Sequence, residues 1–269
     1  MLIILGANGM LGNYIYNYFL DQKFPVKAIT RPDYDVIIHD ISILEDIIFK
    51  KTNGIKQVII FNAIGLISQK NNTDKDLLFN VNGFFPKNLG ILCQKNNWQL
   101  IHPSTDCVFN GYLGNYNEES EPDAQDLYGI SKSIADAFLK HTTCIIRTSI
   151  IGENKSGISL LEWVKFNKNN IINGYTNHYW NGITCYQYAK IVYDMITNDA
   201  LFNGIRHIYS NNISKYELIC EINEIFNNNT SQIIPIQHPK FQNKCLISKY
   251  NTRQMPIREQ LIELRDKFK

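Results

Sequence analysis

The sequence predicts an α/β protein in which a doubly wound parallel sheet is followed by a small C-terminal lobe. Through about the first 150 residues, short apolar runs alternate with segments of helical periodicity, which is typical of such a sheet. A glycine-rich turn directly follows the first apolar run, at the place where this kind of sheet binds phosphate groups. The 269 residues, 44% of them hydrophobic, suffice for one large domain with an appendage.

Each element of the sheet domain follows from a local pattern. Short apolar runs predict strands over residues 2–5, 26–29, 58–61, 100–102 and 144–147, and helical periodicity predicts helices over 11–22, 42–51, 84–94 and 127–140. The helix at 42 is expected to start at Ser42-Ile-Leu-Glu45, which has the spacing of a capping box. Residues 104–126 are rich in Gly, Asn, Glu and Pro, so they predict a long loop, and such loops are usually functional.

The strict alternation weakens after residue 151. Helices are predicted over 160–168, 186–196 and 258–268, and a strand over 206–209. A second capping box, Ser214-Lys-Tyr-Glu217, predicts the start of another helix. We therefore expect a sheet domain over residues 1–152 and a smaller lobe over 153–269, segments of which can return to the main sheet.

Composition excludes several classes of protein. Lys and Arg number 27 against 25 Asp and Glu, which argues against a nucleic-acid binder. No run approaches the roughly 18 apolar residues of a membrane span, and the apolar N-terminus lacks the basic flank of a leader. The cysteines lie far apart without metal-ligand spacing, which favours reduced thiols in a cytoplasmic protein with no metal site. They are Cys93, Cys107, Cys144, Cys185, Cys220 and Cys245.

The turn at Gly6, Gly9 and Gly12 lies between the first strand and the first helix. Glycine permits a tight turn and a close approach of the backbone, and the helix N-terminus offers N–H groups and a positive dipole end. A dinucleotide diphosphate would lie there, although a purely structural turn gives the same spacing. The cofactor-binding positions expected in this segment are Gly6, Asn8, Gly9, Met10 and Leu11.

The end of the second strand bears on which dinucleotide is bound. An acidic residue there is typical of NAD, whereas Thr30-Arg31 offers a guanidinium that suits a 2'-phosphate. The sequence thus favours NADPH, with NADH as the alternative, and Arg31 can equally be an ordinary exposed cation. Asp40 and Ile41 are candidates for the border of the adenine, and a role unrelated to the cofactor is as open for them.

Tyr128 and Lys132 lie four residues apart on a predicted helix, so both project from one face. An ammonium beside a phenol is expected to lower the phenol's pKa and make it a usable proton donor for ketone reduction. Tyr186 and Lys190 repeat the spacing, but only Tyr128 follows a strand that ends in hydroxyl residues, Ser104-Thr105. Thr105 would hydrogen-bond the ketone oxygen that Tyr128 protonates.

Several stretches together resemble one family. The most specific are Ser104-Thr-Asp-Cys-Val-Phe-Asn-Gly111 and Tyr128-Gly-x-Ser-Lys132, and the others are Gly6 to Gly12, Asn62-Ala63, Asn80-Val-Asn82, Tyr116-x-Glu118 and Arg147-Thr-Ser149. They cover most of residues 1–152. In these residues the chain resembles the extended short-chain dehydrogenase/reductase superfamily, and within it the dTDP-4-dehydrorhamnose reductase family.

The resemblance implies a Rossmann domain that binds NADPH or NADH and reduces the 4-keto group of a nucleotide-activated 4-keto-6-deoxyhexose to a rhamnose-type sugar. Carried over by position, Thr105 would bind the carbonyl, Tyr128 would be the general acid, and Lys132 would tune Tyr128 and hold the nicotinamide ribose. Further residues are implied to border the cofactor. They are Asn62, Ala63, Ile64, Thr148 and Ser149.

Two departures from the family pattern concern the sugar pocket. Cys107 stands where the family usually has Tyr, and Ile150 where Trp often follows Arg-Thr-Ser. A wider pocket would take a bulkier sugar, and residues 122–128 resemble relatives thought to act in UDP-linked N-acetyl-rhamnosamine synthesis. Trp180 either replaces the missing aromatic wall or belongs to the core. The substrate-binding residues expected are Ser104, Asp106, Cys107, Trp180 and Asn181.

The same residues also bear on other possible functions. The related 4,6-dehydratases have Asp-Glu after the threonine, and here Cys107 follows Asp106, which argues against a dehydratase. A nucleotide-sugar epimerase and a non-catalytic NADP-binding regulatory subunit remain as alternatives. The partners expected are a nucleotide-sugar substrate and an upstream dehydratase or epimerase, with neither nucleic acid nor membrane, and a homodimer is compatible with the family.

Overall fold

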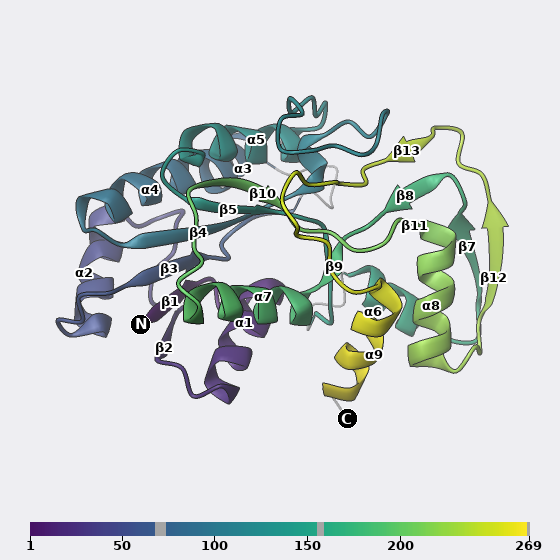
Figure 1. The fold of residues 1–269 in the computed structure, drawn as a ribbon, viewed down its shortest axis with the longest axis horizontal. Helices are drawn as coiled ribbons and strands as arrows, with labels where there is room; N and C mark the ends of the chain where they lie inside the picture. Colours follow the sequence, from purple (N-terminus) through teal and green to yellow (C-terminus); the bar gives the residue numbers. More distant parts are fainter. Residues whose placement is uncertain (68–73, 155–158, 268–269) are drawn as a thin grey trace. The chain divides into compact units, whose positions relative to one another are not determined.

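The computed structural model describes residues 1–67, 74–154 and 159–267 (Figure 1). The chain divides into two compact units that interleave along the sequence. The first comprises Met1–Val108, Pro122–Arg147 and Ala189–Ile205, and the second comprises Phe109–Glu121, Thr148–Tyr188 and Arg206–Lys269. Among the described residues, no helix is long and apolar enough to cross a membrane. All six cysteines are free thiols.

The first unit is built on a six-stranded sheet in the order β10-β5-β4-β3-β1-β2. Its strands are β1 (Leu2–Leu5), β2 (Val26–Ile29), β3 (Ile59–Asn62), β4 (Gln99–Ser104), β5 (Cys144–Arg147) and β10 (Gly204–His207). β1 pairs in parallel with β2 on one side and with β3 on the other. The strand order therefore reverses at β1, and ligands of open α/β sheets bind at such a point.

Helices cover both faces of this sheet, which confirms the predicted doubly wound α/β class (Figure 1). They are α1 (Met10–Asp21), α2 (Ile41–Thr52), α3 (Lys75–Phe79), α4 (Phe85–Lys95), α5 (Leu127–Leu139) and α7 (Cys185–Thr197). β1, β3 and β5 are buried along their whole length, as strands covered on both faces must be. On one face, Ile3, Leu5, Ile60 and Leu89 belong to one apolar core cluster.

The predicted capping box at Ser42 is wrong. Asp40 is the N-cap of α2, because its carboxylate accepts hydrogen bonds from the backbone N–H of Ser42 at 2.9 Å and from its hydroxyl at 2.7 Å. The side chain of Glu45 binds elsewhere and accepts hydrogen bonds from Lys95 and Asn96. An aspartate two residues upstream thus takes the capping role that the Ser-x-x-Glu spacing suggested for Ser42.

The expected helix over 84–94 is preceded by α3 and a π-helical turn, Asn80–Phe84. At this wider turn, the side chain of Asn82 makes two hydrogen bonds to the backbone of Leu66. Its Oδ1 accepts from the N–H of Leu66 and its Nδ2 donates to the carbonyl of Leu66, both at 2.9 Å. Nδ2 also lies 3.2 Å from Oγ of Ser131 on α5. Asn82 therefore fixes the segment that follows β3.

The second unit contains short strands and three helices within its described residues. The helices are α6 (Leu160–Phe166), α8 (Lys215–Asn227) and α9 (Ile257–Lys267). The strands are β6 (Ile150–Ile151), β7 (Ile171–Tyr175), β8 (His178–Trp180), β9 (Ile183–Thr184), β11 (Ile213–Ser214), β12 (Gln232–Ile236) and β13 (Gln242–Asn243). The capping box of Ser214 and Glu217 is confirmed. The strand expected over 206–209 lies two residues earlier and joins the main sheet as β10.

Candidate active site

The glycine turn forms a close-packed cradle at the N-terminus of α1. Gly6 has a φ of +76°, and a Cβ on Gly12 would lie only 2.4 Å from the carbonyl oxygen of Gly6. No side-chain oxygen caps the first turn of α1, whose N-cap is Gly9. Positive partial charge at this helix end suits an anion. The cradle therefore fits a dinucleotide diphosphate.

The end of β3 lies against this cradle. A Cβ on Gly6 would come within 3.1 Å of both Ala63 and Ile64, and Ala63 donates its N–H to the carbonyl of Leu5 at 2.9 Å. Asn62 is buried, and its Oδ1 accepts a hydrogen bond from the N–H of Ile64 at 3.2 Å. The structure thus brings together the predicted cofactor residues of the glycine turn and of β3.

Arg31 follows β2 with 71% of its side chain exposed, and its Nε lies 3.6 Å from a carboxylate oxygen of Asp35. Asp40 and Ile41 line a cavity of about 270 Å³, together with Tyr34 and Phe84. Backbone hydrogen bonding from Ser42 lowers the pKa of Asp40. The lining mixes apolar side chains with polar ones such as His39 and Asn80, and an adenine contact of Asp40 and Ile41 stays a prediction.

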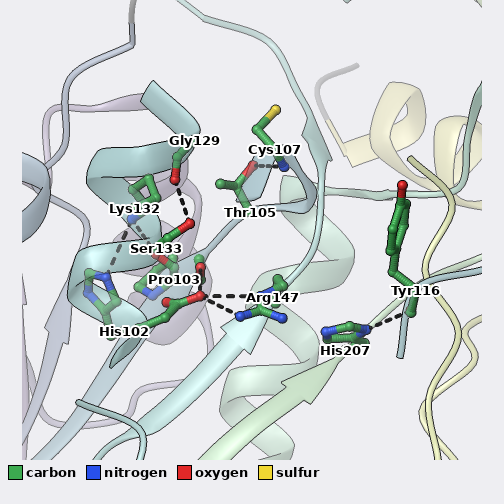
Figure 2. A network of polar contacts seen from close by, with 12 residues as sticks. His102, Pro103, Thr105, Cys107, Tyr116, Gly129, Lys132, Ser133, Arg147 and His207 are labelled. Carbon is green, nitrogen blue, oxygen red and sulfur yellow. Dashed lines mark hydrogen bonds and ion pairs between the residues drawn. The ribbon is translucent and has the colours of Figure 1, made fainter. Parts of the chain in front are cut away.

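Thr105 lies immediately after β4 and beside a 3₁₀ turn, Asp106–Val108. Its hydroxyl donates to Asp106 and accepts from the N–H of Cys107, both at 3.1 Å (Figure 2). The Thr105 hydroxyl also lies near enough to the Tyr128 phenol to affect its pKa. Thr105 and Tyr128, predicted from separate motifs, therefore meet at the carboxyl end of β4.

Gly129 explains how α5 approaches this turn. A Cβ at Gly129 would lie 2.2 Å from the carbonyl oxygen of Cys107 and 2.5 Å from Cβ of Ala124. The N-cap residue Asp126 accepts a hydrogen bond from the N–H of Gly129 at 2.9 Å. Only glycine lets the first turn of α5 lie this close, and that approach brings Tyr128 to Thr105.

The pKa of Tyr128 differs from the expectation. Burial of the phenol raises its pKa, and the interaction with Thr105 opposes this only in part. The prediction that Lys132 lowers this pKa is wrong for the present geometry, because Lys132 makes its closest contacts elsewhere. Its Nζ donates to the carbonyl of Pro103 at 2.7 Å and lies 3.4 Å from Nε2 of His102.

Lys132 is itself perturbed. The residue is 8% exposed, and burial lowers the pKa of its amine to about 8, against the attraction of Asp136. His102 is fully buried, and burial, followed by the charge of Lys132, lowers the pKa of the imidazole well below its usual value. His102 belongs to none of the sequence motifs, although a lone histidine in an apolar strand is a visible signal.

A buried ion pair joins Asp136 on α5 to Arg147 on β5. Asp136 accepts hydrogen bonds from Nη2 and Nε of Arg147 at 2.8 and 3.2 Å, and from Oγ of Ser104 at 2.8 Å (Figure 2). Both charged side chains are at most 2% exposed. The hydroxyl proton of Ser104 is thus donated to Asp136, and the expected role of Ser104 in substrate binding stays a prediction. Arg147 appeared in the sequence only as part of a motif, without a role.

In the second unit, Trp180 and Asn181 are buried. The Nζ of Lys215 lies 5.4 Å from the Trp180 ring centroid. The amide of Asn181 accepts from the N–H of Leu246 at 2.9 Å and donates to its carbonyl at 2.7 Å. These contacts give Asn181 a structural role. Thr148, also buried, donates its hydroxyl to the carbonyl of Ser149 at 3.1 Å.

The Tyr116-x-Glu118 motif acts within the second unit. The carboxylate of Glu118 accepts hydrogen bonds from the N–H of His207, the hydroxyl of Ser248 and the N–H of Lys249. Nδ1 of His207 lies 3.0 Å from the carbonyl of Tyr116 (Figure 2). This motif therefore connects three segments of the unit by hydrogen bonds.

In the described part of the chain, no group of three or more His, Cys, Asp or Glu side chains is placed to hold a metal ion.

Residues 1–253 match the model of the RmlD substrate binding domain family. The chain belongs to this family. One curated relative, the dTDP-4-dehydrorhamnose reductase of Aggregatibacter actinomycetemcomitans, is 28% identical over 154 residues, which are 55% of this chain and 50% of that protein. A second, described as a probable low-salt glycan biosynthesis reductase of Haloferax volcanii, is 24% identical over 60% of this chain and 58% of that protein. The chain thus spans half to three-fifths of the length of these relatives.

Solved structures of this family share the fold. A dTDP-4-dehydrorhamnose reductase from Bacillus anthracis, in complex with NADP, superimposes with a TM-score of 0.82 at 20% identity, covering 100% of this chain and 99% of that one. A hypothetical dTDP-4-dehydrorhamnose reductase from Sulfolobus tokodaii gives 0.77 at 21% identity, covering 96% and 98%. The family and fold expected from the sequence motifs are confirmed.

Proposed function

We propose that this protein is an NADPH-dependent reductase acting on the 4-keto group of a nucleotide-activated 4-keto-6-deoxyhexose, with a rhamnose-type sugar nucleotide as product. One observation carries the proposal: the side chains of Thr105 and Tyr128 lie together at the carboxyl end of β4, where Thr105 acts on the pKa of Tyr128, with Lys132 one helical turn further along α5. A hydroxyl pair at the switch-point edge of the sheet is suited to receive a carbonyl oxygen.

Different residues would bind the cofactor and supply the proton. Gly6, Gly9 and Gly12 would hold the cofactor diphosphate, and the bound cofactor supplies a hydride to the carbonyl carbon. The raised pKa keeps Tyr128 protonated at neutral pH, so its hydroxyl has a proton to give as the carbonyl oxygen gains negative charge. The proton moves from the Tyr128 oxygen to the substrate oxygen, and the tyrosinate then regains one from solvent.

Thr105 orients the substrate oxygen. The N–H of Cys107 holds its oxygen in place. Its single proton is donated to Asp106 here, so the hydroxyl must rotate away from Asp106 to donate to an arriving carbonyl oxygen. Lys132, whose Nζ is anchored on the carbonyl of Pro103, would reach the nicotinamide ribose and favour the tyrosinate that forms after proton transfer.

The nucleotide and the sugar are the finer part of the proposal. The names of the curated and solved relatives point to dTDP-linked 4-keto sugars. Cys107 replaces a larger aromatic residue and is only half-buried, which leaves more room beside Thr105 and favours a UDP-linked 2-acetamido sugar as a second substrate. A 4,6-dehydratase, together with an epimerase, would have to supply either ketone.

The test is a panel of dTDP- and UDP-linked 4-keto-6-deoxy sugars with NADPH, followed by nicotinamide absorbance and product analysis. We expect stoichiometric NADPH oxidation with at least one ketone. Tyr128→Phe should cut turnover by a factor on the order of 10² to 10⁴ while NADPH still binds, because only the proton donor is lost. Sugar interconversion without NADPH consumption would point to an epimerase, and tight NADPH binding without turnover of any ketone to a regulatory subunit.

A further inference from the structure

A chain of buried polar side chains joins β3 to α5 through His102 on β4. Nδ2 of Asn62 lies 3.3 Å from Nδ1 of His102, and Nε2 of His102 lies 3.4 Å from Nζ of Lys132 (Figure 2). Nζ also donates to the carbonyl of Pro103 at 2.7 Å. His102 is fully buried, so its two ring nitrogens face Asn62 and Lys132 instead of solvent.

The donors and acceptors in this chain fix the imidazole tautomer. Oδ1 of Asn62 accepts from the N–H of Ile64, which orients the amide so that its NH₂ group faces His102. A neutral imidazole has one acceptor nitrogen and one N–H, so Nδ1 accepts from Asn62. The proton is then on Nε2, which points at the Lys132 nitrogen and can donate to it once the amine is neutral, above the Lys132 pKa of about 8.

The other charges near Lys132 largely offset one another, so the contact with His102 decides which protonation form of the amine is favoured. Its own helix contributes Tyr128, protonated at neutral pH, and Asp136, whose attraction favours the ammonium. Strand β5 contributes Arg147, which is paired with that carboxylate at 2.8 Å and offsets its charge. Strand β4 contributes His102. An Nε2–H facing the amine favours its neutral form, in line with the lowered pKa of Lys132.

We propose that His102 is a positioning residue for Lys132: its Nε2–H fixes the lysine nitrogen beside the Pro103 carbonyl and connects it, through Asn62, to the strand end that flanks the glycine turn. The inference rests on the proposed role of Lys132 at the cofactor ribose. Its consequence is that the placement of Lys132 depends on a residue that touches neither substrate nor cofactor.

Two variants of similar polarity separate the contacts of His102. In His102→Gln the side-chain amide falls where Nε2 was and keeps the contact with Lys132, and in His102→Asn it falls where Nδ1 was and keeps only the contact with Asn62. We expect His102→Asn to weaken NADPH binding and lower turnover by a factor on the order of 10 to 100, as for other misplaced catalytic groups. The His102→Gln variant should stay within about threefold of the unmodified protein, on the same argument.

The pH dependence of the NADPH dissociation constant, followed by fluorescence from pH 6 to 10, adds a second readout. In His102→Asn the inflection should move to higher pH, because the group that favours the neutral amine is gone. His141→Gln is the control, since His141 is exposed and should leave both affinity and inflection unchanged. Equal losses in His102→Gln and His102→Asn, or no loss in either, would overturn the proposal.

A measurement on the unmodified protein covers the case in which His102→Asn fails to fold. Nitrogen-15 NMR of the histidine rings, assigned with His102→Gln, should show His102 neutral and protonated on Nε2 at pH 9, above the Lys132 pKa of about 8. Protonation on Nδ1 would refute the proposal. Failure of the proposed function looks different, because Tyr128→Phe and Lys132→Met would then retain turnover, whatever the tautomer of His102.

Discussion

Gly129→Ala tests whether the close approach of α5 to the Cys107 carbonyl sets the active site. The added methyl would start 2.2 Å from that oxygen, whereas ordinary van der Waals contact begins at 3.4 Å, so the backbones must separate by about 1.2 Å. Both obstacles nearest to the methyl, the Cys107 carbonyl and Cβ of Ala124, are attached to backbone and cannot rotate away. Tyr128 would move away from Thr105 by a similar amount.

A displacement near 1 Å of a reacting group costs on the order of 10² in turnover. Stability should change less, because overpacking costs roughly 1–3 kcal/mol while alanine gains up to about 1 kcal/mol over glycine in a helix. We expect the Kd for NADPH to stay near that of the unmodified protein, since the glycine cradle is untouched.

The assay is NADPH oxidation with the ketone identified by the panel, alongside NADPH binding and thermal unfolding. Gly90→Ala is the matched control: its methyl would meet only the tip of the Leu139 side chain, 2.5 Å away, which can rotate. That variant should keep its turnover. If Gly129→Ala retains turnover within twofold, the close approach does not position Tyr128.

Three further predictions concern charge. Arg31→Ala should weaken NADPH much more than NADH, because only NADPH carries a 2'-phosphate; equal effects in titrations with both would make Arg31 incidental. Asp136→Asn should cost roughly 3–5 kcal/mol in urea unfolding, because it leaves Arg147 buried without its counter-ion, while Lys95→Gln, which changes a largely exposed lysine paired with Glu45, should cost at most about 1 kcal/mol. Because the pKa of Lys132 is lowered to about 8 from 10.5, the unfolded chain binds more protons between these values, and stability rises with pH there. Lys132→Met should therefore be more stable than the unmodified protein at pH 7, by roughly 3 kcal/mol, with the difference shrinking by pH 10; a less stable variant at pH 7 would contradict this.

The elements of the main sheet were predictable because their signals are local. Residues 2–5, 26–29 and 144–147 form strands with the predicted bounds, since a short apolar run buried on both faces is hard to mistake. The capping box at Ser214 is also local and was confirmed. The one at Ser42 was wrong because a nearby Asp40 competes for the same backbone N–H groups. Spacing alone does not rank competing caps.

Features that depend on residues far apart in the chain could not be predicted from the sequence. The strands of the second unit are two to five residues long, too short for a clear alternation, and their partners lie far along the chain. The pKa of Tyr128 was mispredicted for a related reason. Helical spacing places Lys132 near the phenol, but it says nothing of burial or of the Pro103 carbonyl, which depends on β4 lying beside α5.

The buried partners of the site show the same limit. His102 contacts residues 40 positions before it and 30 after it, and Ser104 meets Asp136 across 32 positions. A sequence displays such residues only as polar interruptions in apolar segments. Thr105 and Tyr128 could be found because a family motif carries them, whereas a positioning residue has no comparable signature.

Asn82 offers the Leu66 backbone the same donor and acceptor pair that a neighbouring strand would offer. One side chain thereby substitutes for a piece of β-ladder and holds the chain beyond β3 in place without extending the sheet. This segment can thus be ordered without adding a strand to the sheet. Protein engineers who reshape it should leave that amide intact and vary its neighbours.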